Sequence, residues 1–340
     1  MTTGWAVAGR TGARIAAAIL LAMLAACSEV DDDTVVWDLS LPWSIQEFHT
    51  QNAIRFAAQV EQATQGRLRI KVHPGAVLGI KGQGSLRAVE EGLVDMADLS
   101  AFQQVGTEPI LGLESLPFLV DSHDDLALLY DQLRPSIDAA LARHNLKVVY
   151  IVPWPNQNIY TKTRVDELSA LRGQKMRTYD KLSSTLMERL GMVPVQMPSQ
   201  DVVAALASGA IDAVMTSTTT GAAQKYWEFL DYIYRTNHLW SSNIMAVNLD
   251  SWNGLPADVR ATVERLARTL EPAFWDVSRA DDQDKLKVLE ANGMRVVEPS
   301  PELIDQMRRA ARPMWGDFFD AVPEAATVVD AYLAARDRAS

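Results

Sequence analysis

Arg177 is the residue whose type and position most directly indicate ligand chemistry in this sequence. It follows a short run after Gly173, in a segment over 166–178 that predicts a helix, a glycine turn and a strand. Side chains that leave strand ends in open α/β sheets line the crevice where such sheets bind ligands. A guanidinium there can hold a carboxylate through two parallel N–H bonds. At this point, pairing with a surface acid such as Asp180 explains Arg177 equally well.

The residues that catalysis or metal binding would need are not arranged for either. The five histidines are scattered without ligand spacing, no serine elbow occurs, and Cys27 is the only cysteine. Residues 79–84 form a glycine-rich turn before a helix, but their spacing fits neither a Walker loop nor a dinucleotide fingerprint. We therefore expect no enzyme activity, no cofactor and no metal site.

Two elements must position Arg177, a strand and the sheet that contains it. Short apolar runs over 96–99, 147–152 and 244–247, flanked by helices, indicate strands buried on both faces of a largely parallel sheet. The fold class is therefore α/β. A helical pattern over 256–292 contains Pro272 and is long enough to brace two lobes at once.

The remaining pattern adds strands and helices around this frame. We predict strands over 35–41 and 67–73, and helices over 48–64 and 85–91. A further helix should begin after Ser300, because serine is a favoured N-cap and a proline follows it in the first turn.

The amino terminus has the features of an export signal. Arg10 and Arg14 precede an uncharged run over 15–26, which is too short to span a bilayer. About 300 residues remain after this leader and the polar stretch that follows it, which is enough chain for two domains.

The leader ends in Leu24-Ala25-Ala26-Cys27, the order of the bacterial lipoprotein processing box. We predict a signal peptide over 1–27, lipid attachment at Cys27 and a polar tether over 28–33. An ordinary secretory signal with an incidental cysteine, or a short membrane helix, is the alternative.

Charge limits the partners of the chain. The 340 residues carry a formal net charge of -11 and no cluster of lysines and arginines. A surface that tracks phosphates needs such a cluster, so we expect no nucleic-acid partner. A single cysteine also excludes a disulfide framework.

Several motifs occur in a fixed order along the chain. They are Leu78-Gly79, Gly92 with Asp95, Leu116-Pro117-Phe118, Leu171-Arg172-Gly173-Gln174-Lys175-Met176-Arg177, Leu190-Gly191-Met192-Val193-Pro194-Val195-Gln196-Met197-Pro198, the run 201–209, Ile211-Asp212, Thr236-Asn237-His238 and Leu255-Pro256. No one motif is specific, but their number and order are. Over about residues 37–320 the chain resembles the solute-binding subunits, of DctP type, of tripartite ATP-independent periplasmic (TRAP) transporters.

The resemblance implies a two-lobe periplasmic binding protein fold with a central ligand cleft and a long helix bracing both lobes. It places 34–153 and 242–282 in lobe I, and 154–241 and 283–335 in lobe II. Arg177 matches the arginine that clamps the substrate carboxylate in this family. The lobes would close on the ligand, and the closed form would be recognised by the membrane permease.

Other cleft positions depart from the family pattern. Gln157 stands where binders of acidic sugars and dicarboxylates often hold a second arginine, and Thr216 lies near a position where asparagine is common. Ser100 and Gln103 occupy places that often hold a charged pair. A second carboxylate would be desolvated there without a cationic partner, so we expect a ligand with one carboxylate.

Three tryptophans, Trp43, Trp154 and Trp240, fall in loops that the resemblance directs toward the cleft. Tryptophan offers a large apolar area and one N–H donor, which favours an apolar or aromatic monocarboxylate or a 2-oxo acid. Packing between the lobes without ligand contact is an equal alternative for each. The predicted ligand-binding residues are Arg177, Gln157, Asn158, Trp154, Thr216, Tyr179, Trp43, Ser100, Gln103, Trp240 and Asn243.

The resemblance thus implies a periplasmic receptor that delivers a small organic acid to the TRAP permease subunits and touches the membrane through its lipid anchor only. Two other functions use the same architecture: a sensor that signals to a membrane partner, and a binding protein of an ABC transporter. Neighbouring genes for two multi-span subunits, for a kinase or for an ATPase would separate the three.

Overall fold

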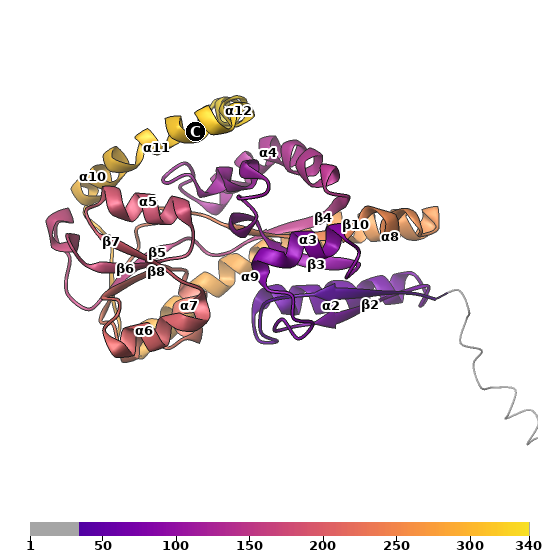
Figure 1. Ribbon diagram of the computed structural model, residues 1–340, viewed down its shortest axis with the longest axis horizontal. Helices are drawn as coiled ribbons and strands as arrows, with labels where there is room; N and C mark the ends of the chain where they lie inside the picture. Colours follow the sequence, from indigo (N-terminus) through magenta and orange to yellow (C-terminus); the bar gives the residue numbers. More distant parts are fainter. Residues whose placement is uncertain (1–33, 340) are drawn as a thin grey trace, which may run out of the picture.

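The computed structural model describes residues 34–339, which form two α/β lobes beside one another (Figure 1). The predicted signal peptide, Cys27 and the tether lie outside these residues. The strands are β1 (Val35–Ser40), β2 (Leu68–His73), β3 (Met96–Ser100), β4 (Leu146–Pro153), β5 (Asn158–Thr161), β6 (Lys175–Thr178), β7 (Val193–Gln196), β8 (Ala213–Thr216), β9 (Tyr232–Tyr234), β10 (Ser242–Asn248) and β11 (Arg295–Val297). The α-helices are α2 (Phe48–Ala63), α3 (Ser85–Glu90), α4 (His123–Arg143), α5 (Lys181–Arg189), α6 (Val202–Ser208), α7 (Thr218–Ala223), α8 (Leu249–Asn253), α9 (Ala257–Ala291), α10 (Pro301–Ala311), α11 (Pro313–Ala321) and α12 (Pro323–Ala339).

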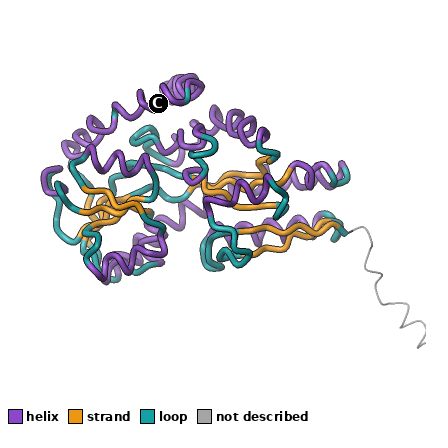
Figure 2. Tube along the Cα trace, in the orientation of Figure 1, coloured by secondary structure: helices purple, strands orange, loops and turns teal. Residues whose placement is uncertain are grey.

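Each lobe contains one mixed sheet with helices outside it (Figure 2). Lobe I has the order β2-β1-β3-β10-β4, in which β10 is antiparallel to β3 and β4. We expected a largely parallel sheet. The difference arises because β10 enters lobe I from lobe II and begins opposite the end of β4, where Ser242 pairs with Pro153. Its direction is therefore opposite to that of the strands that run toward the cleft.

The sheet of lobe II has the order β11-β9-β5-β8-β6-β7. Strand β6, which carries Arg177, lies parallel to both of its neighbours, β7 and β8. The glycine turn predicted before it is present, since Gly173 adopts a positive φ of 73° that favours glycine. A short helical turn at Leu168–Leu171 precedes this glycine.

The central strands are buried on both faces, as predicted. In β3, Met96 packs in one apolar cluster while Ala97 and Leu99 pack in another on the opposite face of the sheet. The runs predicted as strands correspond to β3, β4 and β10. The predicted N-cap is also present, because the Ser300 hydroxyl accepts a hydrogen bond from the Leu303 N–H at 3.1 Å.

Two of the crossings between the lobes lie side by side, one after β4 and one before β10. The two crossing segments are hydrogen-bonded to each other. The Trp154 N–H donates to the Ser241 carbonyl at 2.8 Å, and the Gln157 N–H donates to the Leu239 carbonyl at 3.0 Å. This pairing makes the connection a two-stranded hinge rather than two independent loops.

Helix α9 confirms the expected bracing helix. It spans 35 residues with Pro272 inside it, and it packs on α2 and β4 of lobe I and on α7 of lobe II. Figure 1 shows it running behind both lobes. No helix within residues 34–339 has both the length and the apolar character that crossing a membrane requires.

The C-terminal helices do not stay with lobe II, to which we assigned 283–335. Helix α10 packs on α5 of lobe II, but α12 packs on α4 of lobe I. The Tyr332 hydroxyl donates to the Leu119 carbonyl at 3.1 Å, and Val329 and Tyr332 belong to the apolar core of lobe I. The end of the chain therefore forms a third connection between the lobes.

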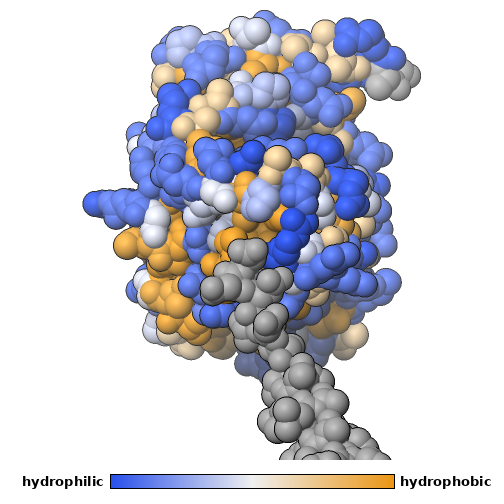
Figure 3. All heavy atoms as spheres, turned by 90° about the vertical axis from the view of Figure 1, so that its right-hand side faces the viewer, coloured by the Kyte–Doolittle hydropathy of each residue, from blue (hydrophilic) through white to orange (hydrophobic). Residues whose placement is uncertain are grey.

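The outer end of lobe I is mainly hydrophilic, with apolar residues gathered in one part of the face (Figure 3). This is the ordinary appearance of a surface in contact with water, where exposed apolar side chains are common.

Candidate ligand-binding site

Arg177 is buried on the face of β6 opposite Met176, which packs in the core of lobe II. Only 4% of its surface is exposed. Its Nε donates to the Met197 carbonyl at 3.3 Å, and its Nη1 donates to the Met215 carbonyl at 3.2 Å. Nη2 donates to no residue within 34–339.

The guanidinium forms no ion pair in the described part of the chain, although the charge of the nearby Asp180 carboxylate acts on it. Burial lowers the pKa of Arg177, because the charged form loses its hydration. Asp180, the alternative partner, is used elsewhere: it caps α5 by accepting a hydrogen bond from the Ser183 N–H at 2.7 Å. A buried cation with free N–H groups and no carboxylate partner is arranged to receive an anion.

The register of the lobe II sheet places other predicted residues on the same face as Arg177. Arg177 lies opposite Val214 in β8, and Thr216, two residues further along β8, lies opposite Asn158 in β5. Asn158 is fully buried, and its Oδ1 has no hydrogen-bond partner among residues 34–339. Gln157, also buried, precedes it in the crossing segment.

The predicted residues of lobe I form a second group. Ser100 in β3 lies opposite Asn243 in β10, and both are buried. The Trp154 Nε1 donates to the Asn243 Oδ1 at 2.9 Å. Trp43 meets Trp154 edge to face, with ring centroids 4.8 Å apart. These four side chains therefore form one wall at the cleft end of the lobe I sheet.

Tyr179 joins the two groups. Its ring lies 5.6 Å from the Arg177 guanidinium and 4.8 Å from the ring of Phe102 in lobe I. Gln103 and Tyr179 both line a pocket of about 690 Å³ between the lobes, together with Phe102 and Phe318. The lobes are therefore in contact beside the buried arginine.

Trp240 lies away from these groups. Its indole is buried in the core of lobe I, its Nε1 donates to the Val120 carbonyl at 3.1 Å, and its ring contacts His123 at 4.7 Å. The single polar group of this tryptophan is already satisfied. Its place in the fold is core packing next to the hinge, and it does not join the other predicted residues.

Asp98, which lies in the middle of β3, is not among the residues predicted from the sequence. It is 2% exposed, and its Oδ1 has no hydrogen-bond partner between residues 34 and 339. Burial raises the pKa of Asp98 to about 7, while the N–H groups of Asn243 and Trp43 act in the opposite direction. The sequence contained the indication: an acid inside a strand predicted to be buried on both faces needs an explanation.

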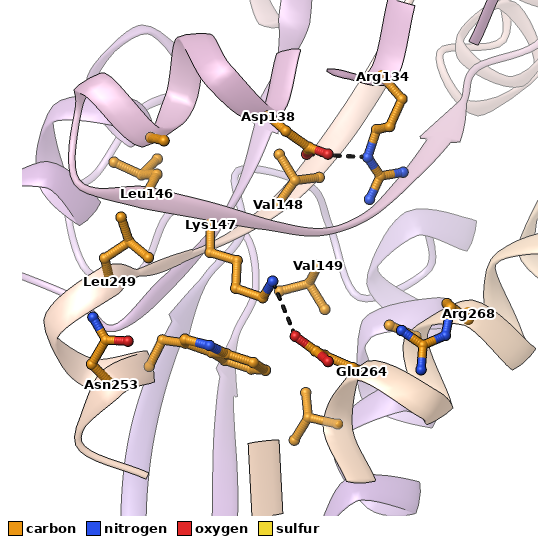
Figure 4. Close-up of a pocket in the computed structure, with 14 residues that line it drawn as sticks. Arg134, Asp138, Leu146, Lys147, Val148, Val149, Leu249, Asn253, Glu264 and Arg268 are labelled. Atoms are coloured by element: carbon orange, nitrogen blue, oxygen red, sulfur yellow. Dashed lines mark hydrogen bonds and ion pairs between the residues drawn. The ribbon is translucent and has the colours of Figure 1, made fainter. Parts of the chain in front are cut away.

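A second pocket, of about 480 Å³, lies on lobe I between α4, β4 and α9 (Figure 4). Four of its charged side chains form two ion pairs. Lys147 Nζ lies 3.2 Å from Glu264 Oε1, and Arg134 Nε lies 3.3 Å from Asp138 Oδ1. None of the predicted ligand-binding residues lines it. It therefore differs from the neighbourhood of Arg177, where the positive charge has no partner.

The sequence matches the family model DctP, described as bacterial extracellular solute-binding protein, family 7, over residues 40–321. The chain belongs to this family. Its members are the solute receptors of TRAP transporters, and this chain is a TRAP solute-binding protein for small organic acids.

Among curated relatives, a solute-binding protein of Albidiferax ferrireducens is 25% identical over 280 residues, covering 80% of this chain and 82% of the relative. The 2,3-diketo-L-gulonate-binding periplasmic protein of Escherichia coli is 24% identical, covering 76% of this chain and 77% of the relative.

Two solved structures of TRAP receptors are similar throughout. A Bordetella pertussis extracytoplasmic solute receptor binding pyroglutamic acid has a TM-score of 0.84 and 29% identity, covering 88% of this chain and 99% of that chain. A marine metagenome TRAP solute-binding protein specific for pyroglutamate has a TM-score of 0.82 and 31% identity with the same coverage.

Proposed function

We propose that this TRAP receptor captures a small monocarboxylate between its lobes, with the carboxylate held by Arg177. The observation that supports this most directly is the isolation of one charge. Arg177 is the only arginine or lysine that is buried among residues 34–339, and it has no carboxylate partner there. A desolvated guanidinium gains most from a bidentate, charged acceptor.

The other predicted ligand-binding positions argue against a ligand with a second carboxylate. Gln157, Thr216, Ser100 and Gln103 are uncharged, and no other buried cation is present in the described residues. A dicarboxylate would place its second charge in a desolvated site without a partner, which costs several kcal/mol. A ligand with one carboxylate avoids this cost.

Within this class, pyroglutamate is the ligand that we propose to test first. Two receptors of 29% and 31% identity bind it. It carries one carboxylate and a small polar lactam ring. Buried polar atoms without partners, such as the Asn158 Oδ1 and the Ser100 hydroxyl, favour a ligand with polar groups over the wholly apolar or aromatic acid that the tryptophans alone indicate.

Lobe closure connects capture to delivery. In this proposal the acid first meets Arg177 in lobe II, and the wall formed by Trp43, Trp154 and Asn243 then contacts it from lobe I. The closed receptor releases the acid to the TRAP permease subunits. The protein works in the periplasm, held to a membrane by a lipid on Cys27.

Calorimetric titration with pyroglutamate and a panel of carboxylic acids tests the role of Arg177. Arg177→Ala should weaken binding of the best acid at least about 100-fold, because two charge-assisted hydrogen bonds of roughly 1.5 to 3 kcal/mol each are lost. Arg177→Lys should also weaken binding, since lysine keeps the positive charge but cannot donate two parallel N–H bonds to a carboxylate.

The matched control is Arg172→Ala, which removes an exposed arginine from the same segment and should leave affinity unchanged. Thermal unfolding verifies that each variant is folded. Full affinity in folded Arg177→Ala protein would contradict the proposed function.

A further inference from the structure

Asp98 is a buried carboxyl on the wall of lobe I that faces the ligand in the proposed function. It lies two residues before Ser100 in β3, so both side chains project from the same face of the sheet. Ser100 lies opposite Asn243, which is hydrogen-bonded to Trp154. Asp98 therefore belongs to the surface that carries four of the predicted ligand-binding residues.

The polar side-chain groups that face Asp98 include two donors. The N–H groups of Trp43 and Asn243 are near enough to affect its carboxyl, and neither the Trp43 Nε1 nor the Asn243 Nδ2 has a hydrogen-bond partner in the described chain. No lysine or arginine pairs with Asp98 within residues 34–339. An ionised carboxyl only accepts hydrogen bonds, so its free oxygen can take a further donor, such as one that a ligand supplies.

A surface with one strong hydrogen-bond acceptor beside hydrogen-bond donors is complementary to an amide group, which has an N–H on one side and a carbonyl oxygen on the other. The acceptor takes an N–H, and the donors take the neighbouring carbonyl oxygen. A buried acceptor that receives no donor costs about 1 to 3 kcal/mol, which is the usual basis for rejecting analogues that lack the donor.

We propose that Asp98 is a specificity residue, which accepts a hydrogen bond from an N–H group next to the carboxylate of the bound acid. This inference rests on the proposed function, because Arg177 holds the carboxylate of the same ligand. Asp98 thereby selects cyclic or acylated 2-amido acids, of which pyroglutamate is the simplest cyclic example, over acids of the same shape without the N–H.

A matched pair of ligands tests Asp98. Pyroglutamate and 5-oxotetrahydrofuran-2-carboxylate differ only in the ring N–H, which is an oxygen atom in the second. Calorimetry of the wild-type protein should show about a 10- to 100-fold preference for pyroglutamate. Asp98→Ala should reduce this ratio to about one, because the acceptor is gone.

Asp98→Asn is the second variant, since it keeps the size of the side chain and should fold where alanine does not. Its amide can turn an NH2 group toward the ring oxygen, so the ratio should again fall toward one. Arg177→Ala serves as the comparison: it should weaken both acids by the same factor and leave their ratio unchanged.

The possible failures are distinguishable. An unchanged ratio in both Asp98 variants, equal weakening of both acids by them, or wild-type protein that binds neither acid would each overturn the role of Asp98. In all three cases other carboxylates that bind in an Arg177-dependent manner would leave the proposed function standing. Undiminished binding by Arg177→Ala would instead overturn the proposed function.

Discussion

At the residue scale, the site depends on groups that are buried without the partners that buried charges normally have. Arg177 is held in place by two backbone carbonyls, which orient the guanidinium without neutralising it. Surface arginines of the same protein behave differently: Arg67 pairs with Asp258, for example. The contrast separates the arginine that we propose to bind the ligand from a structural one, although both are the same residue type in the sequence.

The carboxyl of Asp98 predicts a pH effect on stability. Its pKa is raised from 3.8 to about 7 by burial, so between about pH 4 and pH 7 the folded state binds a proton that the unfolded chain has lost. The free energy of unfolding therefore decreases as the pH rises through this window, by at most about 1.4 kcal/mol per pH unit from this group.

Asp98→Asn cannot lose a proton, so its stability relative to the wild type should increase between pH 5 and pH 8. Urea unfolding of both ligand-free proteins at these pH values measures the difference. Other titrating groups, including Glu114, whose pKa burial also raises to about 7, are common to both proteins and cancel. Parallel pH dependence of the two proteins would contradict the burial of an unpaired carboxyl at this position.

At the scale of elements, the sequence predicted most strands and helices near this site, but not the direction in which every strand pairs or the element on which every helix packs. Periodicity and glycine positions located β3, β4, β6 and α9, because these signals are local. The direction of β10 and the docking of α12 on α4 depend on contacts between distant segments, which no local pattern contains. Asp98 was not predicted because it stands alone between the apolar residues Ala97 and Leu99 of β3, whose apolar run indicates a buried strand.

Helix α7 provides a test of the packing behind the site. Gly221 faces β5, and a Cβ added there would lie 2.5 Å from the Tyr160 hydroxyl oxygen and 2.8 Å from Cζ of the same ring. The Tyr160 hydroxyl donates to the Ser217 carbonyl at 3.1 Å, so the ring cannot move without losing this bond. Gly221→Ala should lower the free energy of unfolding by about 1 to 3 kcal/mol.

The matched control is Gly316→Ala in α11, where a Cβ meets no atom within 4 Å. Alanine is a better helix former than glycine, so this substitution should be neutral or stabilise the protein by up to about 1 kcal/mol. Urea unfolding of the two variants gives the comparison. Equal effects at the two glycines would mean that α7 does not pack on β5 as closely as described.

At the scale of the whole molecule, the lobes are connected at three places. The crossing segments are paired by backbone hydrogen bonds, α9 spans both lobes, and α10 to α12 pass from lobe II to lobe I. The Phe102–Tyr179 contact joins the lobes beside Arg177. The proposed ligand-binding arginine and the contact between the lobes therefore belong to one connected set of side chains, as capture by closure requires.

The most direct test is a crystal structure of the protein with pyroglutamate or with the acid that binds best in the panel. We predict that both carboxylate oxygens lie within hydrogen-bond distance of the Arg177 guanidinium, with the ring between the lobes. A bound acid whose carboxylate is held elsewhere, with Arg177 still bonded only to backbone carbonyls, would contradict the central claim.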